Sequence, residues 1–358
     1  MAVVISGSAS SERRHEKRKS GSVSMTLAII VACIALGIGG TFLFLGVRDY
    51  NEMMDSRDSW AEISMIASGS GLGQPSGQEN LMDRFIEIPL DVDPESADYE
   101  LLVQSSQAVY DSKDYLYKAI DLPAIQSMNP YVSGYIYIPG TPIDYPIMKE
   151  LSVGEYFYID HNIYNRYDKY GSIFELCDEE RGETSPITWI FGHHMASGSM
   201  FSGLYNFLDA DFADTSIYIY RGGYRSEYKA FGACIVDLHD DAYAFGEYEP
   251  SSQEYTALLS RLSRLNKLPA NNIPWPDPSE NIVILSTCYG GSGTRERLIV
   301  LCTEQRRAVA PDYYRTLQEA QEYGGSQDGI DADTVPGYDD VERSENLSGV
   351  PDYAGTNG

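Results

Sequence analysis

The sequence predicts a mainly β protein, an eight-stranded barrel that is closed or nearly closed, preceded by one long apolar helix. Short apolar and β-branched runs recur from residue 131 to residue 304, and turn-forming residues separate them. Long helical patterns are few in this stretch, which is typical of a barrel. The expected strands cover residues 131–138, 143–148, 171–177, 187–193, 215–221, 226–238, 281–288 and 297–304.

Helical spacing is expected at two places around these strands. Residues 252–266, between the sixth and seventh strands, carry apolar side chains at positions 255, 258, 259, 262 and 265, so they are predicted to form one amphipathic helix. Residues 99–128 have apolar positions at 101, 102, 109, 116 and 120, which predicts an N-terminal helical subdomain packed against the barrel.

The apolar helix is expected to cross a membrane. Residues 25–47 contain no charged side chain, and at about 1.5 Å per residue this length is enough for a hydrocarbon core of about 30 Å. Lys and Arg residues lie before it, at positions 13, 14, 17, 18 and 19. By the positive-inside rule the basic segment 1–24 stays in the cytoplasm. The chain is therefore predicted to be a single-pass protein of the cell membrane, with everything after Arg48 outside the cell.

The rest of the chain divides into a linker, the barrel and a tail. Residues 48–97 are polar and contain a Gly- and Ser-rich run at 69–77, which predicts an extracellular linker. Residues 305–358 are rich in Gly, Asp, Glu and Ser and are predicted to be disordered. The formal net charge is −27, and because residues 1–47 carry five Lys and Arg against two Glu, −30 falls on the exported part. Such a polyanion excludes nucleic acid as a partner held by general electrostatics.

One cysteine stands at the end of a predicted strand. Residues 281–288 are an apolar, β-branched run that stops at Cys288, and a glycine-rich turn then leads to Arg297 at the start of the next strand. A cysteine in mid-strand is usually a small core hydrophobe. Beside a flexible loop and a guanidinium, the Cys288 thiol instead has the features of a nucleophile.

The other cysteines have different surroundings. Cys33 lies in the predicted membrane helix. Cys177, Cys234 and Cys302 are expected to be core thiols, although a contact between Cys234 and Cys302 stays open. Because a thiol nucleophile must remain reduced to work, a framework of disulfides is not the favoured interpretation.

Two histidines stand at the end of a predicted strand, as Cys288 does. The run 187–193 ends in His193, and His194 follows directly. If the two strand ends lie side by side in one sheet, an imidazole and a thiol come within reach of each other. Because side chains alternate along a strand, only one of the two histidines can point at Cys288.

Several segments resemble the sortase family, specifically class B. They are Ile190-Phe-Gly-His-His-Met-Ala-Ser-Gly-Ser-Met-Phe, and Leu285-Ser-Thr-Cys with an arginine opening the following strand. Further similar segments are Asn129-Pro130, residues 134–147 and Gly171-Ser-Ile-Phe, so the resemblance covers about residues 98–304. Ile284 replaces the first threonine of the family's Thr-Leu-x-Thr-Cys motif. His194 stands where class B relatives usually carry asparagine.

The resemblance implies a sortase-like barrel with its N-terminal helical subdomain, and the activity of a cysteine transpeptidase that needs no cofactor. Cys288 would be the nucleophile and His193 the acid and base, with His194 as the alternative. Arg297 would stabilise the oxyanion, and Arg295, two residues earlier on the same face, stays open from periodicity alone. Two residues beside the nucleophile would contact substrate, namely Ser286 and Thr287.

The same resemblance implies the partners. They are secreted proteins bearing a C-terminal sorting signal, cleaved at a Thr-Gly-like bond, and an amine of the cell-wall precursor that receives the acyl fragment. A pilin polymerase, which would join the fragment to a pilin lysine, is one alternative. A catalytically idle, membrane-tethered binding or scaffold protein is an alternative of another class.

Two further histidines are not expected to act in catalysis. His161 lies beside Asp160 in a connecting segment and is interpreted as structural. His239 lies among acidic residues at positions 237, 240 and 241, but the spacing does not match a zinc or EF-hand site. No metal site is therefore predicted.

Overall fold

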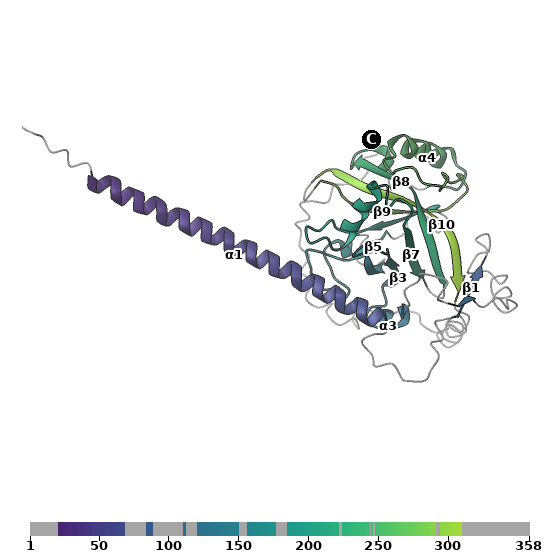
Figure 1. Ribbon diagram of the computed structural model, residues 1–358, viewed down its shortest axis with the longest axis horizontal. Helices are drawn as coiled ribbons and strands as arrows, with labels where there is room; N and C mark the ends of the chain where they lie inside the picture. Colours follow the sequence, from purple (N-terminus) through teal and green to yellow (C-terminus); the bar gives the residue numbers. More distant parts are fainter. Residues whose placement is uncertain are drawn as a thin grey trace, which may run out of the picture. The chain divides into compact units, whose positions relative to one another are not determined.

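The computed structural model describes residues 21–68, 84–88, 110–111, 120–149, 156–176, 185–221, 224–243, 245, 248–290 and 294–309. The chain forms two compact units, Met1–Met54 and Asp55–Gly358. Helix α1 (Gly21–Ala67) contributes to both, and all the strands belong to the second unit (Figure 1).

Eight strands of the second unit form a closed ring (Figure 1). Around the ring each strand is hydrogen-bonded to the next in the order β10, β8, β7, β3, β4, β5, β6, β9 and back to β10. The predicted eight-stranded barrel is thus confirmed. The strands are β3 (Val132–Tyr137), β4 (Asp144–Met148), β5 (Ile173–Glu175), β6 (Ile187–Phe191), β7 (Ser216–Arg221), β8 (Tyr224–Asp237), β9 (Ile282–Cys288) and β10 (Glu296–Val309).

The last strand runs further than the sequence indicated. β10 continues to Val309, past the expected end at residue 304, although residues 305–307 are polar. Ion pairs hold this polar stretch in the sheet: Arg306 pairs with Glu227 at 2.7 Å, and Arg307 pairs with Glu304 at 2.6 Å. The predicted start of the disordered tail at residue 305 is therefore wrong by at least five residues.

Two short strands in the region before the barrel were also missed. β1 (Arg84–Ile88) pairs antiparallel with the end of β10, and β2 (Tyr110–Asp111) pairs with β1. Residues 84–88 thus add a strand to the sheet within the segment that was predicted as a linker. The end of β10 is polar and was not predicted as a strand. The sequence pattern therefore did not indicate that β1 and β2 could extend the sheet there.

Helix α1 covers more of the predicted linker. It continues to Ala67, and its last turns in the second unit bury Trp60, Ile63 and Ala67, which share one face at helical spacing. The Ser64 hydroxyl donates to Asp144 of β4 at 2.5 Å. Residues 55–67 are therefore part of the folded domain, and the linker prediction is wrong for them.

The remaining helices are short, apart from α4. Helix α4 (Gln253–Leu265) packs against β8 and confirms the helix predicted at 252–266; the Ser252 hydroxyl caps it by accepting from the Tyr255 amide. The others are α3 (Leu122–Gln126), η3 (Phe157–Ile159), η4 (Phe201–Leu208) and η5 (Asp241–Tyr243). Most of the predicted helical subdomain at 99–128 lies outside the described residues. Within it, α3 is helical, but residues 110–111 form the strand β2, so the helix prediction is wrong at those two positions.

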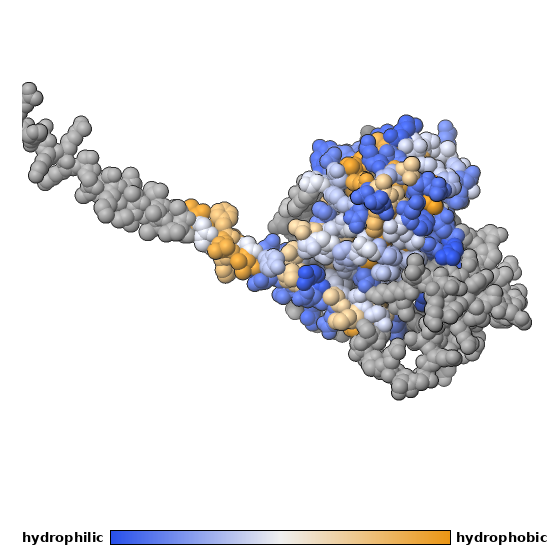
Figure 2. All heavy atoms as spheres, viewed as in Figure 1, coloured by the Kyte–Doolittle hydropathy of each residue, from blue (hydrophilic) through white to orange (hydrophobic). Residues whose placement is uncertain are grey.

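Helix α1 also spans the predicted membrane segment 25–47. The side chains of residues 25–29 and 31–37 lie outside the described residues. Within the part of the chain that is described, no helix combines the length and apolar character needed to cross a membrane. The large apolar side chains at the described end of the segment are exposed, including Phe42, Leu43 and Phe44, and they form the orange surface of this unit in Figure 2.

An ion pair links the ends of β5 and β7. Glu175 on β5 is only 4% exposed, and the Arg221 guanidinium donates to its two carboxylate oxygens at 3.2 and 2.5 Å. The Lys149 ammonium lies 3.6 Å from the same carboxylate. Burial alone would raise the pKa of Glu175, but the charge and hydrogen bonds of Arg221, together with Lys149, lower this pKa below its ordinary value.

Glu175→Ala is expected to lower the free energy of unfolding by about 3 kcal/mol at pH 7, because it leaves the Arg221 guanidinium, which is 22% exposed, without its buried partner. Urea denaturation measures the loss, and Asp211→Ala, which removes an exposed carboxylate, serves as the control. Because the pKa of Glu175 is lower in the folded protein, its contribution to the free energy of unfolding is complete above the pKa of the unfolded carboxyl group. The contribution decreases as the pH falls through the pKa of the folded protein. The difference in the free energy of unfolding between Glu175→Ala and wild type should therefore decrease below about pH 4. A loss below about 1 kcal/mol at pH 7 would contradict this interpretation.

Candidate active site

One pocket opens where β6 and β9 end. These strands are parallel neighbours, and Phe191 of β6 lies opposite Ser286 of β9. The Gly192 amide extends the pairing by donating to the Ser286 carbonyl at 3.1 Å. The prediction that the histidine-bearing and cysteine-bearing strand ends lie side by side is thus confirmed. The pocket is lined by residues from both ends and from four neighbouring segments: Tyr156, Ile159, Phe174, Phe191, Gly192, His193, Leu238, Tyr243, Phe245, Ser286, Thr287, Cys288 and Arg297.

Gly192 brings the chain out of β6 through a tight space. A Cβ atom at this position would lie 2.4 Å from Ile173 Cδ1 and 2.7 Å from Phe201 Cγ. Only glycine fits there without moving its neighbours. β6 itself ends at Phe191, two residues earlier than predicted, so His193 and His194 belong to the segment after the strand and simple strand alternation does not separate them.

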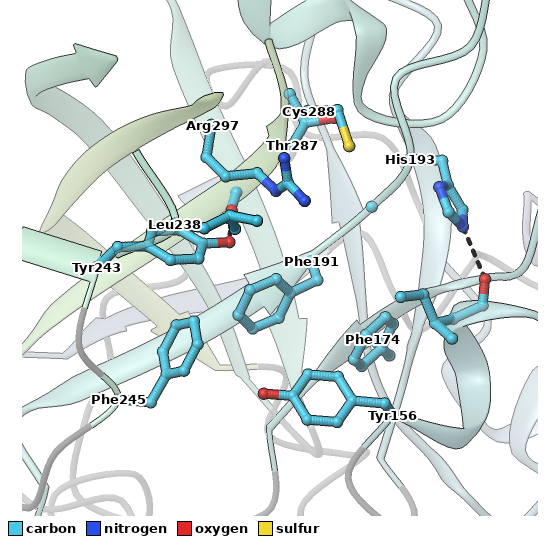
Figure 3. Close-up of a pocket in the computed structure, with 13 residues that line it drawn as sticks. Tyr156, Phe174, Phe191, His193, Leu238, Tyr243, Phe245, Thr287, Cys288 and Arg297 are labelled. Carbon is cyan, nitrogen blue, oxygen red and sulfur yellow. Dashed lines mark hydrogen bonds between the residues drawn. The ribbon is translucent and has the colours of Figure 1, made fainter. Parts of the chain in front are cut away.

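His193 stands opposite Cys288 across the pocket (Figure 3). Its Nε2 lies 2.7 Å from the Ile159 carbonyl oxygen. Because a carbonyl can only accept, Nε2 must carry the hydrogen, and in the neutral ring the lone pair is on Nδ1. Nδ1 can then take up a proton and return it while Nε2 stays anchored. The pocket thus holds a histidine with one fixed nitrogen and one that is suited to proton transfer.

His194 is directed elsewhere. Its ring stacks on Tyr205 with ring centroids 4.4 Å apart, and it does not line the pocket. Burial lowers the pKa of His194, which favours the neutral ring at pH 7. The geometry therefore supports His193 over His194 as the acid and base.

Cys288 and Arg297 are cross-strand partners. They lie directly opposite each other in the antiparallel pair of β9 and β10, so their side chains leave the same face of the sheet. The Arg297 Nη1 donates to the carbonyls of Thr294 and Glu296 at 2.8 and 3.0 Å, which fixes the guanidinium at the pocket edge near the thiol (Figure 3). The structure thus places a fixed cation beside the candidate nucleophile.

Arg295 faces away from this site. Its side chain is 64% exposed and donates to Asp237 at 2.8 Å, and it does not line the pocket. Of the two arginines that the sequence left open, Arg297 is the one that shares the pocket with Cys288 and His193.

The other described cysteines are core thiols, as expected. Cys234 and Cys302 are free and fully buried. Burial raises the pKa of the Cys234 thiol to about 12 and also raises the pKa of Cys302, so neither forms thiolate readily. Cys177 lies outside the described residues. Cys288 is the partly exposed thiol among them.

Ser286 and Thr287 both line the pocket, but their hydroxyls differ. The Ser286 hydroxyl is hydrogen-bonded to that of Tyr243 at 2.8 Å. The Thr287 side chain is 2% exposed, and its hydroxyl has no hydrogen-bond partner among the residues that the structure describes. An unsatisfied buried hydroxyl costs free energy unless something else binds it. Of the two hydroxyls, that of Thr287 is therefore the one that no described residue engages.

The aromatic wall of the pocket was not predicted from the sequence. Tyr156, Phe174, Phe191, Tyr243 and Phe245 form much of the lining beneath the candidate catalytic groups (Figure 3). Phe191 packs against Phe174 and Phe245 with ring centroids 5.5 and 5.6 Å apart. The aromatic pair at 243 and 245 in the acidic segment after β8 was the available signal, because large apolar rings are unusual in a solvated turn.

The other two described histidines do not line the pocket. His161 stacks on Phe157 with ring centroids 3.9 Å apart, as a structural histidine would. His239 is 66% exposed beside Asp237, which is itself paired with Arg295. Within the described ranges, no group of His, Cys, Asp and Glu side chains could hold a metal ion.

Comparison with known proteins gives two curated relatives. The chain is 28% identical to Sortase B of Listeria monocytogenes over 169 residues, which cover 47% of this chain and 67% of the relative. It is 25% identical to Sortase B of Staphylococcus aureus over 222 residues, which cover 61% and 88%. No family model matches the chain.

Solved structures similar to this one carry the same name. A Staphylococcus aureus sortase B-substrate complex is 22% identical, with 52% of this chain and 84% of that chain covered and a TM-score of 0.45. Sortase B from Listeria monocytogenes is 26% identical, with 50% and 97% covered and a TM-score of 0.43. The two curated relatives, with the motifs at residues 190–201 and 285–288, support a class B-like sortase and an enzyme of the cysteine transpeptidase type.

Proposed function

We propose that this protein is a membrane-anchored sortase that cleaves a C-terminal sorting signal at a Thr-Gly-like bond and transfers the acyl fragment to an amine of the cell-wall precursor. The observation that carries the proposal is the meeting of Cys288, His193 and Arg297 in one pocket, at the ends of β9 and β6 and the start of β10. A nucleophile, a proton carrier and a fixed cation are the groups that acyl transfer through a thioester requires.

The reaction starts with Cys288 as the thiolate and with a proton on His193 Nδ1. In the first half the thiolate attacks the carbonyl carbon of the scissile peptide bond. The carbonyl oxygen becomes negatively charged, and the Arg297 guanidinium donates hydrogen bonds to it. A donor placed for an oxyanion contributes about 3–4 kcal/mol in comparable sites. As the C–N bond breaks, His193 gives the Nδ1 proton to the leaving amine, and the acyl group remains on sulfur as a thioester.

In the second half an amine attacks the thioester. His193 Nδ1 accepts a proton from the amine as the new C–N bond forms, and the C–S bond breaks to regenerate the thiolate. The hydrogen bond from Nε2 to the Ile159 carbonyl keeps the ring in place through both proton transfers. The aromatic wall keeps part of the pocket dry, which strengthens the interaction of Arg297 with the oxyanion.

Membrane anchoring is supported by the apolar surface of α1. Phe42, Leu43 and Phe44 are consecutive and 71, 69 and 66% exposed. Consecutive residues lie about 100° apart around a helix, so these side chains surround the helix with apolar surface. A helix that is apolar all round is suited to a buried or membrane environment. With the basic residues before it, this favours a cytoplasmic N-terminus and an extracellular catalytic domain.

The test is turnover of a fluorogenic peptide library of sorting signals by the domain from residue 55 onward. Cleavage of a Thr-Gly-like bond with a thioester trapped on Cys288 is the expected result, and it would exclude the idle scaffold. Mass analysis of the product with a wall-precursor amine or a pilin lysine as acceptor then separates wall anchoring from pilin polymerisation. No cleavage of any library member would contradict the proposal.

Thr287→Val is expected to raise KM about threefold to tenfold and leave kcat nearly unchanged, because the hydroxyl would bind the peptide equally in the ground and transition states. Valine has the same shape, and the free protein loses no hydrogen bond among the described residues, so stability should be unchanged or rise by up to about 1 kcal/mol. Steady-state kinetics and thermal unfolding measure both effects. An unchanged KM would show that the hydroxyl does not contact substrate.

A further inference from the structure

Tyr205 connects the two segments that carry the proposed catalytic groups. It lies on η4, which follows the turn containing His193 and His194. Its ring is sandwiched in a stack, 4.4 Å from the His194 ring and 5.3 Å from the Tyr289 ring, with interplanar angles of 21° and 15°. One side chain therefore holds the segment after β6 against the segment after β9.

The Tyr205 hydroxyl makes two hydrogen bonds to the main chain around the nucleophile. It donates to the Cys288 carbonyl at 3.1 Å and accepts from the Gly290 amide at 2.9 Å. Gly290 has a φ of 83°, which marks a tight turn. Burial raises the pKa of Tyr205, so the hydroxyl stays protonated and able to donate at neutral pH. The hydroxyl thus bridges the first turn after β9.

We propose that Tyr205 is a positioning residue for Cys288. Cysteine has a single side-chain torsion, so the place of its sulfur is fixed by that torsion and by the main chain on which it stands. Cys288 is the last residue of β9. Beyond it the regular sheet gives way to a turn, and the Tyr205 hydroxyl supplies hydrogen bonds to the main chain there. The inference rests on the proposed function, in which the Cys288 sulfur must reach a substrate carbonyl.

A purely packing role would need only the Tyr205 ring. The ring already fills the space between His194 and Tyr289, and phenylalanine would preserve this stack. The positioning role depends on the hydroxyl, because the hydroxyl makes the hydrogen bonds to the main chain of Cys288 and Gly290. Tyr205→Phe therefore separates the two roles.

The first measurement is steady-state turnover of one sorting peptide by the Tyr205→Phe domain. A nucleophile displaced by about 1 Å can lose about 100-fold in rate, so we expect kcat to fall about 10-fold to 100-fold with KM within about threefold. The second is alkylation of Cys288 by iodoacetamide at about pH 9.5, above the ordinary thiol pKa of about 8.5. The thiolate displaces iodide, and mass spectrometry localises the adduct. A loosened turn should make Cys288 react at least about threefold faster.

The protein contains its own reporters of unfolding. Cys234 and Cys302 are fully buried, so they react with iodoacetamide only when the barrel opens. Their alkylation rates should not change in Tyr205→Phe. Tyr289→Phe is the matched control: it removes one hydroxyl from the same stack, and the described residues show no hydrogen bond to that hydroxyl. Its kcat and its Cys288 alkylation should stay within about twofold of wild type.

The proposal requires slower turnover together with faster alkylation of Cys288 alone. It is overturned if kcat of Tyr205→Phe stays within about twofold of wild type, if Cys288 alkylation is unchanged, or if Cys234 and Cys302 react faster as well. The proposal is also overturned if Tyr289→Phe shows the slower turnover and the faster alkylation of Cys288. Alkylation does not depend on transpeptidation, so a wild-type domain that cleaves no sorting peptide would refute the proposed function, while the alkylation rates would still decide whether Tyr205 orders the Cys288 turn.

Discussion

Cys288→Ala is expected to abolish both peptide cleavage and thioester capture, because no other described thiol lines the pocket. The substitution removes one sulfur atom from a half-buried position at a strand end, so the fold should persist and Tm should move by only a few degrees. Turnover of a sorting peptide and mass spectrometry of the trapped acyl-enzyme measure the loss, with circular dichroism to confirm folding.

The matched controls are Cys234→Ala and Cys302→Ala. Each removes a sulfur atom from the core of the same domain, where burial raises the thiol pKa, so each should lower stability and retain turnover at a temperature where the variant is folded. Cys177→Ala should also retain turnover. A Cys288→Ala variant that still cleaves sorting peptides would show that the nucleophile has been misassigned.

The second large effect is expected from His193→Ala, which should reduce kcat by about 100-fold to 10,000-fold. The leaving amine would depart unprotonated, and the attacking amine would lose its base. The described lining of the pocket holds no second histidine and no carboxylate, so no neighbouring side chain of that kind can take over the proton. Folding should be preserved, because the side chain loses a single hydrogen bond to Ile159.

His194→Asn is the comparison that makes the His193 result specific. His194 lies outside the pocket, and asparagine is the residue common in class B relatives, so turnover should stay within about threefold of wild type. Both variants are assayed with one sorting peptide at matched folded fraction. An inactive His194→Asn beside an active His193→Ala would reverse the assignment.

The barrel could be predicted because its strands are regular where they are buried. β9 reads Ile-Val-Ile-Leu-Ser-Thr-Cys, and six of its seven residues are buried. The polar end of β10 could not be predicted in the same way, because its stability comes from ion pairs with residues such as Glu227, about 80 positions earlier in the chain. Local periodicity contains no information on such long-range pairs.

In the candidate active site, too, some features could be predicted from the sequence and others could not. Cys288 and Arg297 could be inferred from their places at strand ends, and the register of β9 and β10 brings them together. The choice between His193 and His194 needed the tertiary structure, because both follow the end of β6 and differ in what they touch: the Ile159 carbonyl or the Tyr205 ring. The role of Tyr205 was likewise invisible, since a tyrosine in a short helix has no distinguishing pattern.

The pairing of β9 with both β6 and β10 has a consequence for the order of events during synthesis. Among the described strands β9 and β10 come last in the chain, and until they are available β6 and β8 are the open edges of an incomplete sheet. Such edges are prone to pair with other chains. The final 30 or so residues of the barrel therefore pair with these edges, and the same residues bring Cys288 into the pocket. A chain that stops before β10 would have no activity and would be prone to aggregate. Its dependence on chaperones should therefore be greatest just before β10 becomes available.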